Sequence, residues 1–144
     1  MIPWPSIRGV IFDMDGTLTL PVIDFALMRA RLGVPEGDIL TAIRAWPPDK
    51  QAWAFAEVEQ LEEEANRQLK LQPGAEAVMR ALDARGIQKA ILTRNSEKSV
   101  RHLQRFLDTR FSVVITRDFP AVKPDPAPAL HICRTWQLDP ARVL

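Results

Sequence analysis

Two aspartates with one residue between them occur in the run DMDGT, which covers residues 13–17. They follow the apolar, β-branched residues 7–12, a pattern that predicts a buried strand ending in a turn. Gly16 allows the tight turn that would aim Asp13 and Asp15 at a ligand. Burying two carboxylates is unfavourable unless positive charge compensates them, and a divalent cation is the natural compensation. The pair therefore predicts a magnesium site that includes Asp13 and Asp15.

Two other interpretations of the DMDGT run stay open at this point. One is a calcium loop of the EF-hand kind, which needs a preceding helix, oxygen ligands at its first, third and fifth positions, and glycine at the sixth. In this sequence the glycine is the fourth residue of the run, and a strand precedes it. The other interpretation is a purely structural turn. The preceding strand favours the magnesium site over the calcium loop.

Thr93 directly follows a second strand-like run, residues 86–92, and precedes Arg94 and Asn95. Its hydroxyl group and the backbone amides after it could bind an anion, helped by the start of the helix predicted from Ser96. A threonine at the end of a strand is more often structural, so this signal is weak on its own.

Lys123 follows a third strand-like run, residues 111–115, on a loop that contains Pro124 and Pro126. Two prolines stiffen such a loop and would hold the ammonium group in place at little entropic cost. On its own, this residue would more often be a surface lysine. Thr93 and Lys123 become candidates for a functional site because both follow predicted strands.

The three strand-like runs are joined in a way that predicts a parallel sheet. Between the second and third runs lies an amphipathic helix, residues 96–107, which makes a strand-helix-strand unit with a right-handed crossover. Residues 75–85 and 126–137 predict two further packing helices. In an open parallel sheet, ligands bind outside the carboxyl ends of the strands. The polar residues that follow the three runs should therefore converge on one site.

Residues 19–72 differ from the rest of the chain because they show helical patterns between prolines and no strand-like run. We therefore predict an α/β fold, a Rossmann-like parallel three-layer sandwich. Its core consists of residues 1–18 and 73–144, and residues 19–72 form a helical cap. The last cap helix is predicted over residues 49–71, with its glutamates facing solvent. Its expected buried stripe consists of Trp53, Val58, Leu61, Ala65 and Leu69.

The composition limits the kinds of partner. The chain has 144 residues, 47% of them hydrophobic, and a net charge of +1 from 19 Lys and Arg against 18 Asp and Glu. Such a balance gives no global field for nucleic acid or anionic lipid, so a small molecule is the expected partner. No apolar run approaches the roughly 18 residues of a membrane span, and residues 1–10 lack the pattern of a signal peptide. A cytoplasmic location is predicted, and the lone Cys133 is given no role.

Together, the stretches FDMDGTLT, LTRNS and KPDP resemble the first three motifs of the haloacid dehalogenase superfamily. These motifs are DxDGT after the first strand, a hydrophobic run ending in Thr or Ser, and a Lys often followed by Pro. The match spans almost the whole chain, and the first stretch is highly specific. The insertion of residues 19–72 is similar to the cap of the phosphoglycolate phosphatase and β-phosphoglucomutase branch, although it is short.

The resemblance implies a role for each site residue. Asp13 is the implied nucleophile, which forms an aspartyl-phosphate, and Asp15 protonates the leaving group and later activates water. Magnesium contacts the Asp13 carboxylate, the Asp15 backbone carbonyl and an acidic residue of a fourth motif. Lys123 and magnesium neutralise charge, while Thr93 and loop amides hold the phosphoryl oxygens. The implied phosphate-binding residues are Asp13, Gly16, Thr17, Thr93, Arg94, Asn95 and Lys123.

The fourth motif of that superfamily, a Gly-Asp-rich segment after a further strand, is absent from this sequence. Residues 141–144 resemble the beginning of that strand, which in the family lies beside the first one. We therefore expect a chain cut short of the motif, with an incomplete sheet, weak magnesium binding and little activity of its own. An exposed apolar edge of the sheet would also allow the chain to associate with itself.

The function that the resemblance implies is magnesium-dependent hydrolysis of a small-molecule phosphate monoester, similar to that of phosphoglycolate phosphatases. A dehalogenase is disfavoured because those relatives lack a second carboxylate at the position of Asp15. Two alternatives stay open: a phosphomutase with the same two aspartates, and a non-catalytic or inactive chain that acts as a binding module. The sequence does not identify the substrate.

Overall fold

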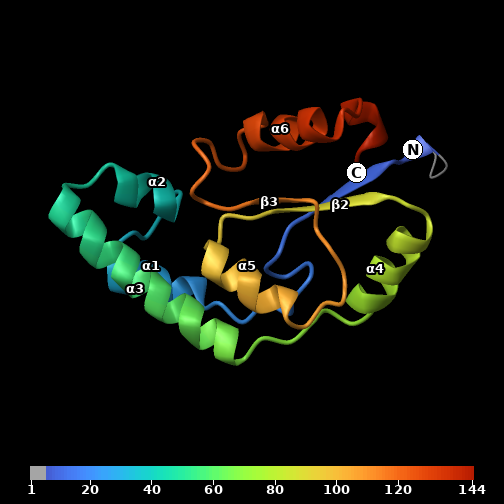
Figure 1. The fold of residues 1–144 in the computed structure, drawn as a ribbon. Helices are drawn as coiled ribbons and strands as arrows, with labels where there is room; N and C mark the ends of the chain where they lie inside the picture. Colours follow the sequence, from blue (N-terminus) through green and yellow to red (C-terminus); the bar gives the residue numbers. More distant parts are fainter. Residues whose placement is uncertain (1–5) are drawn as a thin grey trace. The chain divides into compact units, whose positions relative to one another are not determined.

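The computed structural model describes residues 6–144, and its first compact unit is built on a parallel sheet of three strands (Figure 1). In spatial order, the strands are β1 (Gly9–Phe12), β2 (Gln88–Leu92) and β3 (Val113–Ile115). Both neighbouring pairs run parallel. The open parallel sheet confirms the predicted fold class, while residues 1–5 of the predicted core lie outside the described residues.

Helices cover both faces of this sheet (Figure 1). They are α4 (Ala75–Ala84), α5 (Glu97–Gln104) and α6 (Ala127–Trp136), followed by a short 3-10 helix, η2 (Pro140–Arg142). On one face, α6 packs Ile132 and Trp136 against Ala90 of β2. On the other face, Leu82 of α4 packs against Val10 of β1. Helix α5 connects β2 to β3 and forms the predicted crossover.

Close packing of α6 on the sheet requires glycine at position 9. A Cβ atom added to Gly9 would lie 2.5 Å from Cζ3 of Trp136, closer than real Cβ contacts come. The indole Nε1 of Trp136 donates a hydrogen bond to Ser112 Oγ at 2.8 Å, which fixes the ring in this position. Any side chain at position 9 would therefore displace α6.

Val143 and Leu144 continue the sheet on the side of β1 that faces away from β2. Val143 pairs with Gly9 in a parallel bridge, and Leu144 N–H donates to the Gly9 carbonyl at 3.0 Å. Ile11 N–H in turn donates to the Leu144 carbonyl at 2.8 Å. These contacts confirm that the last two residues lie beside the first strand, whereas Ala141 and Arg142 belong to η2 and not to the predicted strand.

A second compact unit, Val22–Leu69, consists of helices. They are α1 (Phe25–Leu32), α2 (Ile39–Arg44) and α3 (Pro48–Arg67). Asp24 and Asp38 cap the first two by accepting backbone N–H groups. The Arg29 guanidinium donates to the Gly37 carbonyl at 2.9 Å, which ties the loop between α1 and α2 to α1. The core of this unit consists of Met28, Leu32, Val34, Ile39, Ile43, Ala54 and Val58.

The two segments that lead into and out of the helical unit pair with each other inside the first unit. Leu20 N–H donates to the Lys70 carbonyl, and Gln72 N–H donates to the Leu18 carbonyl, both at 2.9 Å. Because this pairing attaches both segments to the sheet unit, the helical unit begins at 22 and ends at 69, inside the predicted range 19–72.

The buried side of α3 differs from the predicted stripe. Trp53 is 45% exposed, while Glu62, expected on the solvent face, is only 5% exposed. The buried positions of α3 are Ala54, Val58, Glu62 and Ala65. Val58 and Ala65 are buried as predicted, but the prediction was wrong for Trp53 and Glu62 because it assumed that the large aromatic residue faces inward. Instead, the small Ala54 is completely buried and allows close packing.

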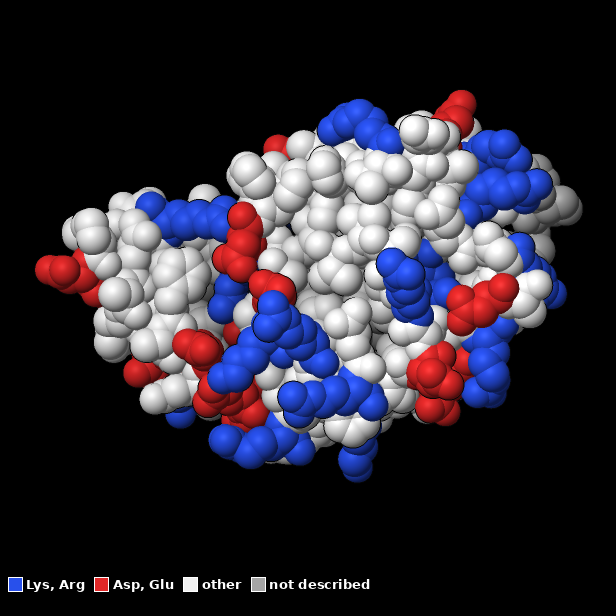
Figure 2. Space-filling view, viewed as in Figure 1, with Lys and Arg blue, Asp and Glu red and all other residues white. Residues whose placement is uncertain are grey.

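Helix polarity and surface charge bear on the predicted location and partners. Among residues 6–144, no helix is both long enough and apolar enough to cross a membrane. On the face shown in Figure 2, lysine and arginine lie among aspartate and glutamate, in keeping with the net charge of +1. The cytoplasmic location and the small-molecule partner stay predictions.

Candidate active site

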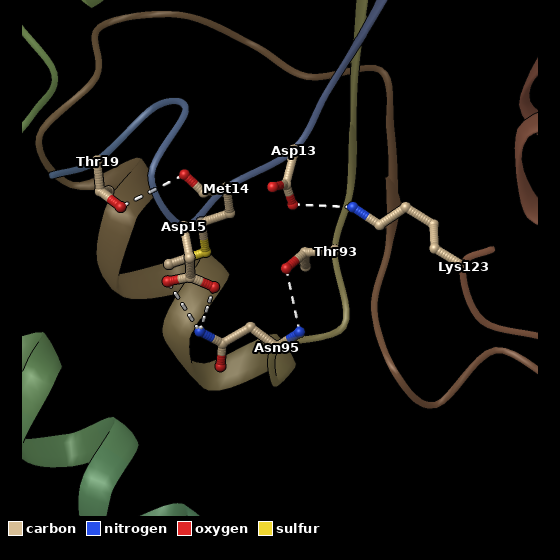
Figure 3. Close-up of polar contacts among 7 residues, drawn as sticks. All are labelled: Asp13, Met14, Asp15, Thr19, Thr93, Asn95 and Lys123. Atoms are coloured by element: carbon tan, nitrogen blue, oxygen red, sulfur yellow. Dashed lines mark hydrogen bonds and ion pairs between the residues drawn. The ribbon is translucent and has the colours of Figure 1, made fainter. Parts of the chain in front are cut away.

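Three of the predicted site residues follow neighbouring strands at the carboxyl edge of the sheet (Figure 3). Asp13 directly follows β1, Thr93 directly follows β2, and Lys123 lies on the loop after β3. The parallel pairing keeps these strand ends level, and Thr93 N–H donates to the Ile115 carbonyl at 2.9 Å. The structure thus brings together the residues that the sequence predicted to converge.

Asp13 and Lys123 form an ion pair on the exposed side of the site. Lys123 Nζ donates to Asp13 Oδ1 at 2.9 Å, and the side chains of Lys123 and Asp13 are 34% and 45% exposed. Such a pair contributes little to stability because water screens it. Within residues 6–144, no group hydrogen-bonds the second carboxylate oxygen, Oδ2, of Asp13. Asp13 therefore presents one oxygen to solvent beside a fixed positive charge.

A single carbonyl group holds the turn that follows β1. The Met14 carbonyl accepts hydrogen bonds from three backbone N–H groups, those of Thr17, Leu18 and Thr19. It also accepts the Thr19 hydroxyl at 3.3 Å. Gly16 has a φ of +78°, a left-handed conformation that glycine adopts without strain. The turn therefore fixes the backbone on both sides of Asp15.

Asp15 is more buried than Asp13 and is held by Asn95 (Figure 3). Asn95 Nδ2 donates to both carboxylate oxygens of Asp15, at 3.1 Å to Oδ2 and 3.4 Å to Oδ1. Burial raises the pKa of Asp15 above its ordinary value; the Asn95 hydrogen bond opposes this effect and the negative charge of Asp13 adds to it. The group therefore keeps a proton more readily than an ordinary aspartate, which suits a residue that both donates and accepts protons.

Thr93 is buried, and its hydroxyl oxygen accepts the Asn95 N–H at 3.0 Å. This bond closes the short turn between β2 and α5. Ser96 caps α5 by accepting the Ser99 N–H at 3.2 Å, so the helix starts next to this turn. No group among residues 6–144 accepts the hydroxyl hydrogen of Thr93, which is therefore available to an anion.

The remaining residues predicted to bind phosphate differ in their surroundings. Gly16 and Thr17 are exposed in the turn after β1, and Arg94 is half-buried after β2. Asn95 is buried, and its side chain contacts Asp15. Sequence reasoning missed this contact, and no local signal could have revealed it, because the two residues are 80 positions apart.

The donor atoms of the site suit a metal ion that is shared with a substrate. In the part of the chain that the structure describes, no cluster of three or more His, Cys, Asp or Glu side chains could hold a metal ion. The site offers the Asp13 carboxylate, together with the Asp15 backbone carbonyl that the family resemblance implies as a ligand. Magnesium typically binds one or two carboxylates together with phosphate oxygens and water. The residues therefore fit magnesium in a substrate complex better than in a closed protein site.

The sequence is similar to those of known hydrolases. Residues 7–144 match the family model of haloacid dehalogenase-like hydrolases. Over 150 residues, the chain is 41% identical to a haloacid dehalogenase-like hydrolase domain-containing protein of Arabidopsis thaliana, in a match that covers 96% of this chain. The match covers 61% of the Arabidopsis protein, so this chain spans less than two thirds of that relative's length.

Two further matches are to proteins described as phosphoglycolate phosphatases. The chain is 29% identical over 167 residues to phosphoglycolate phosphatase of Haemophilus influenzae, covering 92% of this chain and 73% of that protein. A crystal structure of a predicted phosphoglycolate phosphatase from Haemophilus somnus has a TM-score of 0.71 at 20% identity, over 98% of this chain and 76% of that one. The structural match shows a shared fold.

Proposed function

Because the chain belongs to the haloacid dehalogenase-like hydrolase family, we propose that it hydrolyses phosphate monoesters of small molecules with the help of magnesium. The observation that carries the proposal is the placement of Asp13, Asp15 and Lys123 around one point at the sheet edge (Figure 3). One carboxylate is open to solvent, and the other is half-buried with a raised pKa. Such a pair suits a nucleophile and a proton-transfer group. Similarity to phosphoglycolate phosphatase of Haemophilus influenzae supports a phosphate ester as the substrate.

In the first half-reaction, Asp13 Oδ2 attacks the phosphorus atom of the bound ester and forms an aspartyl-phosphate. The bond from phosphorus to the alcohol oxygen breaks, and the protonated carboxyl group of Asp15 donates its proton to that oxygen. Lys123, whose Nζ is 2.9 Å from Asp13 Oδ1, neutralises charge on the phosphoryl group. The Thr93 hydroxyl donates to one of the phosphoryl oxygens.

In the second half-reaction, the ionised Asp15 removes a proton from a water molecule that attacks phosphorus. The bond between phosphorus and Asp13 breaks, phosphate leaves, and both carboxyl groups return to their starting states. The opposing influences on the pKa of Asp15 suit this double role. Burial favours the protonated form, and the hydrogen bond from Asn95 favours the ionised form.

The residues that would hold magnesium are Asp13, through its carboxylate, and Asp15, through its backbone carbonyl. Phosphate oxygens and water would supply its remaining ligands. Bound there, the ion would supply positive charge that neutralises the phosphate under attack. We therefore expect turnover to depend on a divalent cation.

The test of this function is hydrolysis of p-nitrophenyl phosphate and 2-phosphoglycolate with and without magnesium. Because the site offers few ligands to hold magnesium, we expect wild-type protein to turn over both esters slowly with magnesium, to stop after treatment with a chelator, and to recover when magnesium is restored. Asp13→Asn is the matched control, because the amide keeps the shape of the side chain without its nucleophilic oxygen. Equal turnover by Asp13→Asn would contradict the proposed reaction, and turnover in chelator would contradict the metal requirement.

A further inference from the structure

Every polar atom of Asn95 is hydrogen-bonded within the chain. The backbone N–H donates to Thr93 Oγ1 at 3.0 Å, and the backbone carbonyl accepts Arg117 N–H at 3.2 Å. The side-chain Oδ1 accepts Ser96 N–H at 2.7 Å, and Nδ2 donates to the Asp15 carboxylate. The residue is 5% exposed. Asn95 therefore has little capacity left to bind phosphate, the role that the family resemblance implies.

The same bonds determine the orientation of the Asn95 amide. Because the Ser96 N–H is a donor, it must face the amide oxygen, which turns the NH₂ group toward Asp15. The backbone bonds join Asn95 to the end of β2 and to the loop after β3. The amide is thus held by the sheet, whereas Asp15 lies on a turn.

We propose that Asn95 is a positioning residue, which acts through Asp15 by holding its carboxyl group toward the oxygen of the leaving alcohol. This inference rests on the proposed phosphatase reaction. General acid catalysis requires the acid to lie within hydrogen-bond reach of the oxygen that it protonates. Two contacts from one rigid amide, at 3.1 and 3.4 Å, restrict rotation of the Asp15 carboxyl group. Without Asn95, the Asp15 side chain takes other orientations, and proton transfer becomes less frequent.

This role predicts an effect that depends on the leaving group. p-Nitrophenolate is a stable anion and leaves with little help from a proton, whereas an alkyl alcohol needs the proton as its bond to phosphorus breaks. The ratio kcat/KM reports the steps up to alcohol release and therefore isolates the first half-reaction. Loss of a positioning residue lowers kcat/KM mainly for the alkyl phosphate. Loss of a phosphate ligand lowers kcat/KM for both esters by the same factor.

The experiment compares wild-type protein with Asn95→Ala and Asn95→Asp on 2-phosphoglycolate and p-nitrophenyl phosphate. In Asn95→Ala we expect kcat/KM to fall by about 10- to 100-fold for 2-phosphoglycolate and by less than about threefold for p-nitrophenyl phosphate. Asn95→Asp keeps an acceptor for the Ser96 N–H and loses only the donor, so it serves if Asn95→Ala fails to fold. The added negative charge of Asn95→Asp weakens binding of both esters. For this variant, the quantity to compare with wild type is therefore the ratio of kcat/KM for 2-phosphoglycolate to kcat/KM for p-nitrophenyl phosphate.

Ser96→Ala is the control for local structure. It removes the side chain that caps α5 and leaves the Asn95 amide and the backbone N–H of residue 96 in place. We expect a lower melting temperature and an unchanged ratio of kcat/KM between the two esters. A shift of that ratio as large as in Asn95→Ala would assign the effect to the start of α5 and overturn the proposed role of the amide.

Two further readouts separate positioning from phosphate binding. The Ki of inorganic phosphate should stay within about twofold of wild type in Asn95→Ala, and adding Asn95→Ala to Asp15→Asn should lower kcat/KM no further. Equal losses on both esters, or a markedly weaker Ki for phosphate, would overturn the inference and make Asn95 a phosphate ligand. Wild-type protein that hydrolyses neither ester would instead overturn the proposed function on which the inference rests.

Discussion

The region around the amino-terminal end of β2 and the carboxyl edge of the sheet both contain polar groups, but only the carboxyl edge keeps polar atoms without a partner among residues 6–144. Near the amino-terminal end, Lys89 is 4% exposed and forms an ion pair with Asp83, in the last turn of α4. The Thr109 hydroxyl donates to the other oxygen of Asp83 at 3.0 Å. At the carboxyl end, Thr93 and Asn95 belong to the candidate active site. The hydroxyl hydrogen of Thr93, and Oδ2 of Asp13 after the neighbouring strand β1, have no hydrogen-bond partner among residues 6–144.

This difference separates polar groups that stabilise the fold from polar groups that are available to a ligand. A buried ammonium group is strongly unfavourable without its partner, so Lys89 and Asp83 support the fold as a unit. The hydrogen bond from Lys89 lowers the pKa of Asp83, so Asp83 takes up a proton only at a lower pH than an ordinary aspartate does. At the carboxyl edge of the sheet, in the turn after β1, the raised pKa of Asp15 means that its ionised form weakens the fold. Substitutions in the two regions should therefore affect different properties.

The largest effect is expected from Asp13→Asn. The amide is too poor a nucleophile to substitute for the carboxylate, so kcat should fall by at least about 1000-fold, roughly 4 kcal/mol in the barrier. The melting temperature should stay near that of wild type because the ion pair with Lys123 is partly exposed. Hydrolysis of p-nitrophenyl phosphate and thermal unfolding measure the two properties. A variant that keeps more than about a tenth of the wild-type rate, a change of only ~1.4 kcal/mol, would contradict the nucleophile assignment.

With 2-phosphoglycolate as the substrate, Asp15→Asn should slow both half-reactions by about 100-fold or more, and it should stabilise the fold at neutral pH. The folded state holds the Asp15 proton more tightly than the unfolded state, because the pKa is raised. Ionisation above the unfolded-state pKa therefore weakens folding, and the amide avoids that penalty. Urea unfolding should show that the free energy of unfolding of Asp15→Asn exceeds that of wild type by more at neutral pH than at mildly acidic pH. A destabilised but fully active variant would place Asp15 with the structural groups.

Asp83→Asn should lower stability and leave catalysis intact. Removing one partner of a fully buried ion pair typically costs roughly 3–5 kcal/mol. Because the Asp83 side chain is 47% exposed, we expect a smaller loss, about 2 kcal/mol. The pKa of Asp83 is lowered, so this stabilisation is present above the unfolded-state pKa and is lost as the pH falls through the folded-state value. Denaturant unfolding measures this loss of stability. Reduced turnover with unchanged stability would contradict the assignment of Asp83 to the groups that stabilise the fold.

The smallest effect is expected from Lys89→Met. Replacing buried charge with an apolar side chain of similar length is often neutral or stabilising, so stability should change by less than about 1 kcal/mol. Combined with Asp83→Asn, the same change should recover most of the stability lost in the single variant. A double-mutant cycle on unfolding free energies measures this coupling. If Lys89→Met alone destabilised the fold as much as Asp83→Asn, the charge of Lys89 would have a role beyond the pair.

The predicted site depended on strand ends, and these could be found from the sequence. Runs of apolar residues that stop at Asp13 and Thr93 locate the carboxyl edge of a parallel sheet, where side chains from different strands meet. The contact between Asn95 and Asp15 could not be predicted in this way. It depends on the path of two turns and on which side of the Asn95 amide faces Ser96.

Within helices and strands, hydrophobicity alone was an incomplete guide. Lys89 lies inside a run that predicted a buried apolar strand, and its burial depends on Asp83 from a neighbouring helix. In α3, Trp53 is exposed and Ala54 is buried. The phase of that helix is determined by how closely its neighbours approach, which favours a small residue at the contact. Patterns therefore located the elements more reliably than they located the buried face of each.

The most direct test of the active-site assignment is detection of the aspartyl-phosphate itself. Asp15→Asn should accumulate this intermediate, because p-nitrophenolate leaves without a proton while attack by water is slowed. The variant would be mixed with p-nitrophenyl phosphate and magnesium, quenched in acid, digested and analysed by mass spectrometry. We predict one phosphoryl group on the peptide that contains Asp13, and none when Asp13→Asn is added. A phosphoryl group on another residue, or wild-type turnover with no phosphorylated peptide in the variant, would contradict the assignment.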